Sequence, residues 1–222
     1  MEMLLNKRCE WLSVFVVIAL VAITLPSLAA SSNSQLSYIE NGKPVKPWHI
    51  TVGNVLKQNI KMESGEARTL NGNTIVTETS DGTLHGKWRG KSVKTPWGTD
   101  AESMMTLTGR KLDLSSIVEQ AAIAVKIKIK RAPNQNTTVS MLCNWGMDKC
   151  EGKFPVKHIL KKFPKNQWSN LTIPLNCFAN NGKFDYSQIT NVLKISTKGK
   201  LELEVESVGL VGLPAGNTGC KK

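Results

Sequence analysis

The sequence has 222 residues, of which 29 are Lys or Arg and 17 are Asp or Glu, so its formal net charge is +12. That balance favours acidic partners such as anionic polysaccharide, a lipid surface or nucleic acid. Because the lysines are spread through most segments, a solvated basic surface is the simpler explanation. Beyond the N-terminal segment no apolar run is long enough to cross a membrane, so we expect no integral membrane segment once that segment is removed.

Residues 1–30 have the parts of a secretory signal peptide. Lys7 and Arg8 precede an apolar run from Trp11 to Leu25, and small residues at Ala29 and Ala30 suit cleavage. The alternative is a membrane anchor, but the run is about five residues short of the roughly 20 that a spanning helix needs. We therefore expect an exported protein, periplasmic or extracellular, whose partners do not include nucleic acid. The remaining chain, about 192 residues (222 − 30), fits one domain with one core.

Four cysteines would remain after cleavage: Cys143, Cys150, Cys177 and Cys220. An oxidising compartment makes disulfides the expected state, and four cysteines allow three pairings. Cys143 with Cys150 is the local choice, because the six residues between them are rich in turn formers. The three histidines lie far apart in sequence, so we predict no metal site and no cofactor. Sandwich folds often carry a structural calcium ion, but the sequence offers no ligand set for one.

The first half of the chain predicts short strands separated by turns. Residues 31–45 are polar and proline-rich, and we expect a flexible leader that docks at Trp48. Strands are expected at 50–52, 74–79, 83–89 and 103–107, where β-branched and alternating residues gather. Gly109 and Arg110 are expected to form the turn after the last of these.

Two segments have the clearest period of two. From Ala121 to Arg131, isoleucines and valines alternate with lysines, and from Leu201 to Glu206 apolar residues alternate with glutamates. Each pattern indicates a strand with one wet face. A lysine ladder and a glutamate ladder would attract each other across a strand pair. We therefore predict that these two distant strands are neighbours in one sheet, the alternative being that each wet face is merely solvated.

Between these two segments the sequence predicts a strand, a cysteine loop, a helix and another strand. Apolar residues at helical spacing place the helix at 154–163, with Pro155 in its first turn and Pro164 at its end. The strand at 168–175 is expected to turn Trp168 towards the core. Residues 213–222 are expected to be a tail. Many short strands and one short helix favour an all-β fold, a two-sheet antiparallel β-sandwich of the jelly-roll type, over residues 46–212.

The order of motifs resembles the galactose-binding-like β-sandwich at the C-terminal end of ExoP-type exo-β-glucosidases, which belong to glycoside hydrolase family 3. The matching pieces extend from about Pro44 to Val211, and those in the second half are the more specific. They are W-R-G at 88–90, G-R-K-L-D-L-S at 109–115, A-V-K-I-K-I-K-R-A-P ending at 133, S-M-L-C with C-E-G from 140, I-P-L-N-C-F at 173–178 and L-E-L-E-V-E-S-V-G-L ending at 210.

The resemblance implies the fold but not the hydrolase activity, because the catalytic region of the family 3 enzymes has no counterpart here. A disulfide between Cys143 and Cys150 fits the family pattern. Cys220 lies outside the matching region, so Cys177 is either a buried thiol or the partner of Cys220.

The candidate ligand-binding residues are tryptophans with polar neighbours: Trp88, Arg89, Trp97, Asp100, Asn144 and Trp145. A sugar ring presents an apolar face of C–H groups that stacks on a flat aromatic ring, while its hydroxyls need amide, acid or guanidinium partners. Tryptophan is nonetheless buried on average, so each could belong to the core instead. Two pairs of neighbouring carboxylates, at 100 and 102 and at 148 and 151, are expected to be ordinary loop acids rather than a hydrolytic pair.

These observations predict a non-catalytic, exported carbohydrate-binding module whose partner is a polysaccharide or oligosaccharide. The alternative is a structural protein that docks to a separately encoded glycoside hydrolase or envelope component, which predicts an exposed apolar patch on a sheet face. An enzyme of unrecognised type is a third, less favoured interpretation, and predicts a pocket with converging titratable groups.

Overall fold

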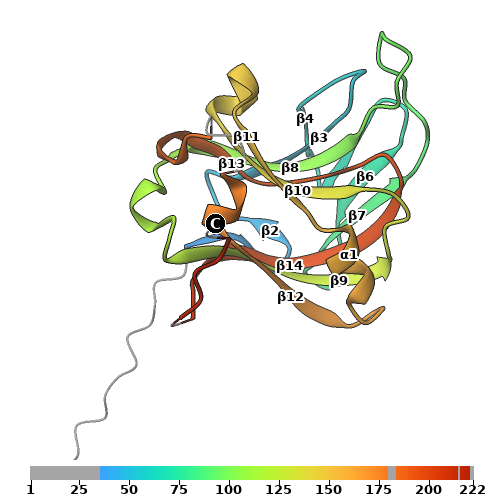
Figure 1. The fold of residues 1–222 in the computed structure, drawn as a ribbon. Helices are drawn as coiled ribbons and strands as arrows, with labels where there is room; N and C mark the ends of the chain where they lie inside the picture. The colour runs from blue at the N-terminus through green and yellow to red at the C-terminus, as the bar shows by residue number, and fades with distance from the viewer. Residues whose placement is uncertain (1–35, 180–183, 215, 221–222) are drawn as a thin grey trace, which may run out of the picture. The chain divides into compact units, whose positions relative to one another are not determined.

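A computed structural model describes residues 36–179, 184–214 and 216–220. Two antiparallel sheets pack face to face, as expected for a β-sandwich (Figure 1). The expected signal peptide at 1–30 lies outside the described residues. None of the described helices is long and apolar enough to cross a membrane.

Eight strands form one sheet and six form the other. The eight-stranded sheet, in spatial order, consists of β12 (Trp168–Pro174), β9 (Ala121–Arg131), β14 (Lys200–Gly212), β7 (Leu84–Arg89), β6 (Thr74–Glu78) and β5 (Glu66–Arg68), with β1 (Ser37–Glu40) and β2 (Lys43–Pro44) added beside β14. The six-stranded sheet consists of β11 (Glu151–Pro155), β10 (Thr137–Cys143), β13 (Ile189–Thr197), β8 (Ser103–Leu112), β3 (His49–Gly53) and β4 (Ile60–Lys61).

The core lies between the two sheets and follows the alternation of the strands. In β9 the side chains of Ile123, Val125, Ile127 and Ile129 point inward and are at most 2% exposed. The short helix α1 (Lys157–Lys162) buries Leu160 against this core. Four 3-10 helices occur in the connections: η1 (Ser115–Ile117), η2 (Asn144–Lys149), η3 (Leu175–Phe178) and η4 (Tyr186–Gln188).

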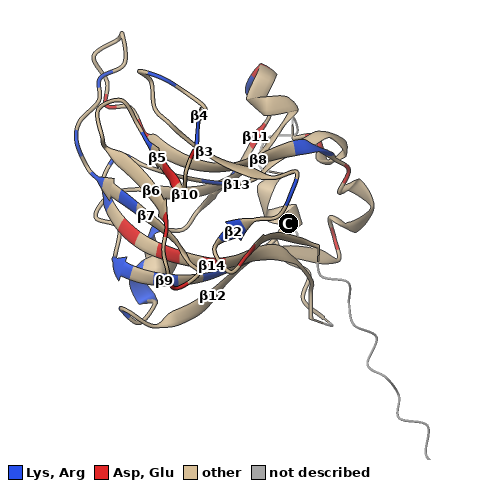
Figure 2. Ribbon diagram, turned by 180° about the vertical axis from the view of Figure 1, so that it is seen from behind, with Lys and Arg blue, Asp and Glu red and all other residues tan. Residues whose placement is uncertain are grey.

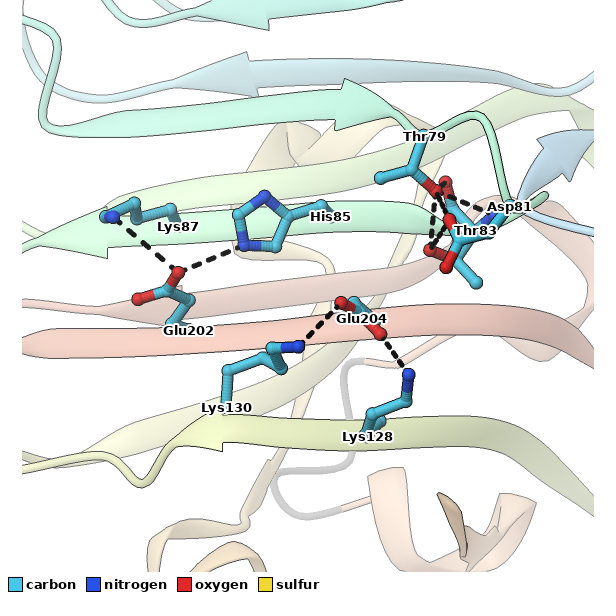
Figure 3. A network of polar contacts seen from close by, with 9 residues as sticks. All are labelled: Thr79, Asp81, Thr83, His85, Lys87, Lys128, Lys130, Glu202 and Glu204. Carbon is cyan, nitrogen blue, oxygen red and sulfur yellow. Dashed lines mark hydrogen bonds and ion pairs between the residues drawn. The ribbon is translucent and has the colours of Figure 1, made fainter. Parts of the chain in front are cut away.

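The predicted pairing of the lysine and glutamate strands is confirmed. β9 and β14 are antiparallel neighbours, with Lys128 opposite Glu204. The outer face of this pair carries ion pairs Lys126–Glu206, Lys128–Glu204 at 2.5 Å and Lys130–Glu204 at 3.2 Å. Figure 2 shows the acidic residues of β14 beside the basic residues of β9. On the other side of β14, Glu202 contacts His85 and Lys87 of β7 (Figure 3).

The structure differs from the expected leader at 31–45, because part of this segment belongs to the sheet. β1 pairs with β14, and β2 pairs with β1. Tyr38 and Ile39 are fully buried, and the ring of Tyr38 meets that of Trp48 edge-on at a centroid distance of 4.9 Å. The β-sandwich therefore begins before residue 46. The polar, proline-rich composition of the segment gave no sign that Tyr38 and Ile39 belong to the core.

The expected turn at Gly109 and Arg110 is wrong, because β8 continues through both residues to Leu112. Gly109 serves packing instead of a turn. A Cβ atom built there would lie 2.4 Å from the indole ring of Trp48. The missing side chain therefore lets this ring lie directly on the strand.

Two further expectations in the second half need correction. The helix is shorter than 154–163, since residues 154 and 155 pair with β10 as part of β11. Trp168 does not face the core: it is 36% exposed on the outer face, and the ammonium group of Lys128 lies 4.4 Å from its ring centroid. Leu171 and Ile173, at odd positions of the same strand, take the buried places.

Both pairs of cysteines form disulfides, Cys143 with Cys150 and Cys177 with Cys220. The second bond resolves the alternatives left open for Cys177. It also attaches part of the expected tail, residues 213–222, to η3. The side chain of Asn176 reinforces this attachment by accepting a hydrogen bond from the backbone N–H of Cys220 at 3.0 Å.

We expect Glu204→Gln to lower the free energy of unfolding by about 1–3 kcal/mol, because it leaves Lys128 and Lys130 without their shared carboxylate in a nearly buried site. The Glu204 side chain is only 11% exposed. Glu206→Gln is the matched control, since its pair with Lys126 is more exposed and should contribute less than about 1 kcal/mol. Urea unfolding at pH 7 measures both; equal costs would contradict the role given to Glu204.

The same site predicts a pH dependence. Burial raises the pKa of Glu204, but hydrogen bonds from Lys128 and Lys130 outweigh burial and hold the pKa below its usual value. A lowered folded-state pKa gives stability that is present above the unfolded value of about 4.3 and is lost as the pH falls through the folded value. The stability difference between wild type and Glu204→Gln should therefore shrink below about pH 4, as measured by urea unfolding across pH.

We expect removal of the long-range disulfide, by Cys177→Ser with Cys220→Ser, to cost more stability than removal of the local one. The two bonds span 43 and 7 residues. Loop-closure entropy alone assigns about 4 kcal/mol to the longer span and about 2.5 kcal/mol to the shorter. Urea unfolding of the two double variants under oxidising conditions tests this order, and the reverse order would contradict it.

Candidate functional site

A cleft of about 870 Å³ lies over the outer face of the six-stranded sheet. Its lining comes from β3, β4, β8, β10, β11 and β13, together with the loop after β3 and the cysteine loop. The lining residues are His49, Thr51, Gln58, Asn59, Lys61, Met104, Thr106, Thr108, Gly109, Leu142, Trp145, Gly146, Lys149, Glu151, Lys153, Asn191 and Lys194.

The strand register places polar side chains in rows across the floor of this cleft. Lys194 of β13 lies opposite Thr106 of β8, which lies opposite Thr51 of β3, which in turn lies opposite Lys61 of β4. A second row joins Asn191 to Thr108 and His49. Strand spacing of about 4.8 Å brings successive members of a row side by side.

The floor of the cleft is recessed relative to its margins because the side chains at its centre are short. Thr51 and Thr106 point outward, yet each is only 4% exposed. Their inward neighbours in β8, Met105 and Leu107, belong to the core. Each threonine presents a hydroxyl, which both donates and accepts hydrogen bonds, and a methyl group. Such a floor can contact both the hydroxyls and the apolar faces of a ligand.

Trp145 borders the cleft from the cysteine loop and is 53% exposed. Its backbone N–H donates a hydrogen bond to the Thr190 hydroxyl at 2.7 Å, which ties the loop to β13. The ammonium group of Lys111 lies 5.4 Å from the centroid of its ring, within the range of a cation–π contact. An aromatic ring thus stands at the margin of a polar floor.

The loop that carries Trp145 has an unusual backbone. Asn144, Trp145, Asp148 and Lys149 all have positive φ angles, between 47° and 60°. This region is uncommon for residues other than glycine and especially so for bulky ones. The disulfide between Cys143 and Cys150, together with the hydrogen bond from Trp145 to Thr190, holds the loop in this conformation. Strain of this kind gathers at functional sites and so directs attention to this loop.

The charged groups of the cleft are mostly lysines. Glu151 contributes a carboxylate, which pairs with Lys194 at 2.9 Å and Lys153 at 3.4 Å. Burial raises the pKa of Glu151, but the charge and hydrogen bond of Lys194 and the charge of Lys153 outweigh it and lower the pKa below its usual value. Glu151 is therefore ionised at neutral pH and is held by two cations.

The chemistry of this lining is suited to binding. Of the residues that line the cleft, Glu151 alone carries a carboxylate, whereas hydrolysis by a carboxylate pair needs two acids across the bond. Its ion pairs keep it ionised, so it does not offer a proton as a general acid does. In the part of the chain that the structure describes, no group of three or more His, Cys, Asp or Glu side chains could hold a metal ion.

Trp88, predicted as a ligand-binding residue, belongs to the core. Its side chain is fully buried, and its indole N–H donates to the backbone carbonyl of Ser103 at 3.0 Å. It therefore presents no ring face to a ligand. The neighbouring Arg89 is exposed at the end of β7. Because Trp88 is buried, the two side chains do not form the expected exposed pair for a sugar.

Trp97 does not line the cleft: it lies in the loop between β7 and β8, in the turn closed by a hydrogen bond from Thr99 to Thr95, where it is 89% exposed. Asp100, in the same loop, pairs with Lys94 at 2.9 Å, and hydrogen bonds from Lys94 and Ser92 lower its pKa. This loop precedes β8, whereas the cysteine loop lies near its far end, so about 30 Å of strand separates them. The candidate residues therefore occupy two sites rather than one.

Asn144 and Trp145 do lie together, and of the six candidates Trp145 alone lines the cleft. Sequence reasoning missed the floor residues Thr51, Thr106 and Thr108. Their alternation with buried neighbours could have marked a wet face. The alternation could not have shown which solvent-facing sheet surface forms the cleft. The rows of polar side chains in its floor arise only when strands that are distant in sequence pair with one another.

The fold is that of known carbohydrate-active proteins. The crystal structure of the exo-1,3/1,4-β-glucanase ExoP from a Pseudoalteromonas species matches with a TM-score of 0.63 at 16% identity, over 84% of this chain but only 21% of that enzyme. The separate structure of its extra C-terminal domain X matches equally well and is covered to 99%. A family 30 carbohydrate-binding module from a cellulosomal cellulase of Clostridium thermocellum matches with a TM-score of 0.54 at 16% identity, over 82% of this chain and 99% of the module.

At these identities the structural matches establish the fold alone, and the chain spans about a fifth of the whole glucanase. A search of curated proteins found no significant match. The family model described as Exop_C, galactose-binding domain-like, matches residues 46–210, which cover most of the sandwich. The chain therefore belongs to the Exop_C family of galactose-binding-like domains.

Proposed function

We propose that this protein is a non-catalytic, exported glycan-binding module that binds a polysaccharide or oligosaccharide in the cleft over the six-stranded sheet. The observation that carries the proposal is Trp145, a ring more than half exposed at the edge of a polar floor. The apolar face of a sugar would stack on this ring. Its hydroxyls would bond to the more accessible polar groups of the lining, the hydroxyl of Thr108 and the amide of Gln58.

The order built into the site supports this role. A binding site gains affinity when its groups are already held in place, because less conformational entropy is lost on binding. The disulfide and the Thr190 hydrogen bond restrain Trp145, while the floor residues sit on paired strands. The cleft volume of about 870 Å³ is in the range of known ligand sites.

The comparisons agree with a binding role. Proteins of the same fold include modules named as carbohydrate-binding and an accessory domain of a glucanase. Two disulfides suit an oxidising compartment and so accord with export through the signal peptide expected at 1–30. The single, ion-paired carboxylate of the cleft accords with binding without hydrolysis.

We expect Trp145→Ala to weaken glycan binding by about tenfold or more, the cost typical of losing a central aromatic contact. Isothermal titration calorimetry against a panel of soluble neutral and acidic glycans measures the change. Trp145→Phe should restore most of the affinity, because a phenyl ring still stacks. The matched control is Trp168→Ala, which removes an exposed tryptophan from the outer face of the other sheet and should change the affinity less than twofold.

Trp97→Ala separates the two candidate locations. If the cleft is the site, this variant binds as wild type does. Loss of binding in Trp97→Ala with full binding in Trp145→Ala would move the site to the loop between β7 and β8. Thermal unfolding of each variant checks that the fold persists.

One observation favours the alternative of docking to a separately encoded glycoside hydrolase or envelope component. Val55, Leu56, Leu70 and Trp97 are exposed on loops of the sandwich. The first three lie on adjoining loops, because the side chain of Asn54 donates to that of Asn71. A sheet-face patch was expected for docking, and these are loop positions instead. A folded wild type that binds no glycan of the panel would favour docking through these loops.

A further inference from the structure

The charge of the cleft bears on which glycans it could select. Four lysines line it, Lys61, Lys149, Lys153 and Lys194, against the one carboxylate of Glu151, a formal balance of +3 (4 − 1). Glu151 already contacts two of these lysines, so it neutralises at most part of their charge. A cleft lined mainly by one sign of charge concentrates the field and attracts ions of the opposite sign.

Two of these lysines have ammonium groups that are available to a ligand. Lys61 stands on β4, at one edge of the sheet, and Lys149 stands in the cysteine loop near Trp145. Both are exposed, and neither has an ion-pair partner within the described residues. A polysaccharide crossing the floor would meet one of them on the β4 side and the other beside the aromatic ring.

The arrangement of the cations also has a spacing. Lys153, Ser140, Lys194, Thr106, Thr51 and Lys61 form one continuous row across the six strands. The backbone of Lys194 is two strands from that of Lys153 and three strands from that of Lys61, about 10 Å and about 14 Å along the row. The ammonium groups of Lys194 and Lys153 are closer than that, because both contact Glu151. The row therefore has two centres of positive charge, the Lys153–Lys194 pair and Lys61, with Thr106 and Thr51 between them. Two separated centres suit a polymer of acidic sugars, because its charges recur along the chain.

We propose that the cleft selects an acidic polysaccharide, one with carboxylates on its sugar rings, over its neutral counterpart. This inference rests on the proposed glycan-binding function and specifies its ligand class. Lys61 and Lys149 contact carboxylates of the chain, Trp145 stacks on a ring, and the threonine floor bonds to hydroxyls. Glu151 orients Lys194 and Lys153 through its two ion pairs and keeps them at fixed positions in the row.

The test uses polygalacturonate and the same polymer after chemical reduction of its carboxyl groups, which removes the charge but keeps the sugar chain. Isothermal titration calorimetry with the purified protein should show at least about tenfold tighter binding of the charged polymer. That preference should decrease as salt is raised, because salt screens exposed charges.

Matched variants then separate the cleft from the general surface charge. Lys61→Gln with Lys149→Gln should lose about tenfold in affinity for polygalacturonate and less than twofold for the reduced polymer. Lys43→Gln with Lys162→Gln removes the same charge from exposed positions outside the cleft and should leave both affinities within twofold.

Three outcomes would overturn the inference, and they differ in what they imply for the proposed function. Equal binding of both polymers, unaffected by the cleft lysines, would leave a glycan-binding module without selection for charge. Equal losses in the two double variants would assign the preference to the whole basic surface. Failure to bind either polymer or any glycan of the panel would end the proposed function as well.

Discussion

The pairing of β9 with β14 is the constraint on which the rest of the structure depends. β14 is the longest strand, with 13 residues, and it lies inside the eight-stranded sheet. It pairs with β9 along one side and with β7 and then β1 along the other. Three strands that are distant in sequence therefore take their register from it. Burial of its inward residues drives the association, and the lysine–glutamate contacts on its outer face favour the observed register.

The two sheets use their outer faces differently. On the eight-stranded sheet, acidic residues of β14 contact lysines of both neighbouring strands, so this face largely satisfies its own charge (Figure 3). On the six-stranded sheet, short threonines leave a hollow, and the charged groups there are mainly lysines. Like charges gathered around a hollow are costly unless a ligand or solvent compensates them. This contrast, within one small fold, separates a structural face from a face suited to binding.

Covalent and backbone restraints place the aromatic ring at that hollow. The cysteine loop adopts left-handed conformations at Asn144 and Asp148, which take them readily, and at Trp145 and Lys149, which do so rarely. The local disulfide closes this loop, and the bond to Thr190 attaches it to β13. The long-range disulfide has a different task, because it secures the chain end after β14 to η3. Both bonds reduce the freedom of the unfolded chain, and the long-range bond does so more, whereas the local bond also shapes the surface at the cleft.

The sequence by itself determined the sandwich class, the strands with a clear period of two, the pairing of β9 with β14 and the local disulfide. All of these follow from patterns or contacts that are visible along the chain or between two strongly patterned strands. Only the tertiary structure decided that Trp88 is buried, that Trp168 is exposed and that Gly109 lies within a strand against Trp48. It alone assembled the cleft. Each of these outcomes depends on which face of a strand meets which neighbour, and that is set by pairing between segments far apart in the sequence.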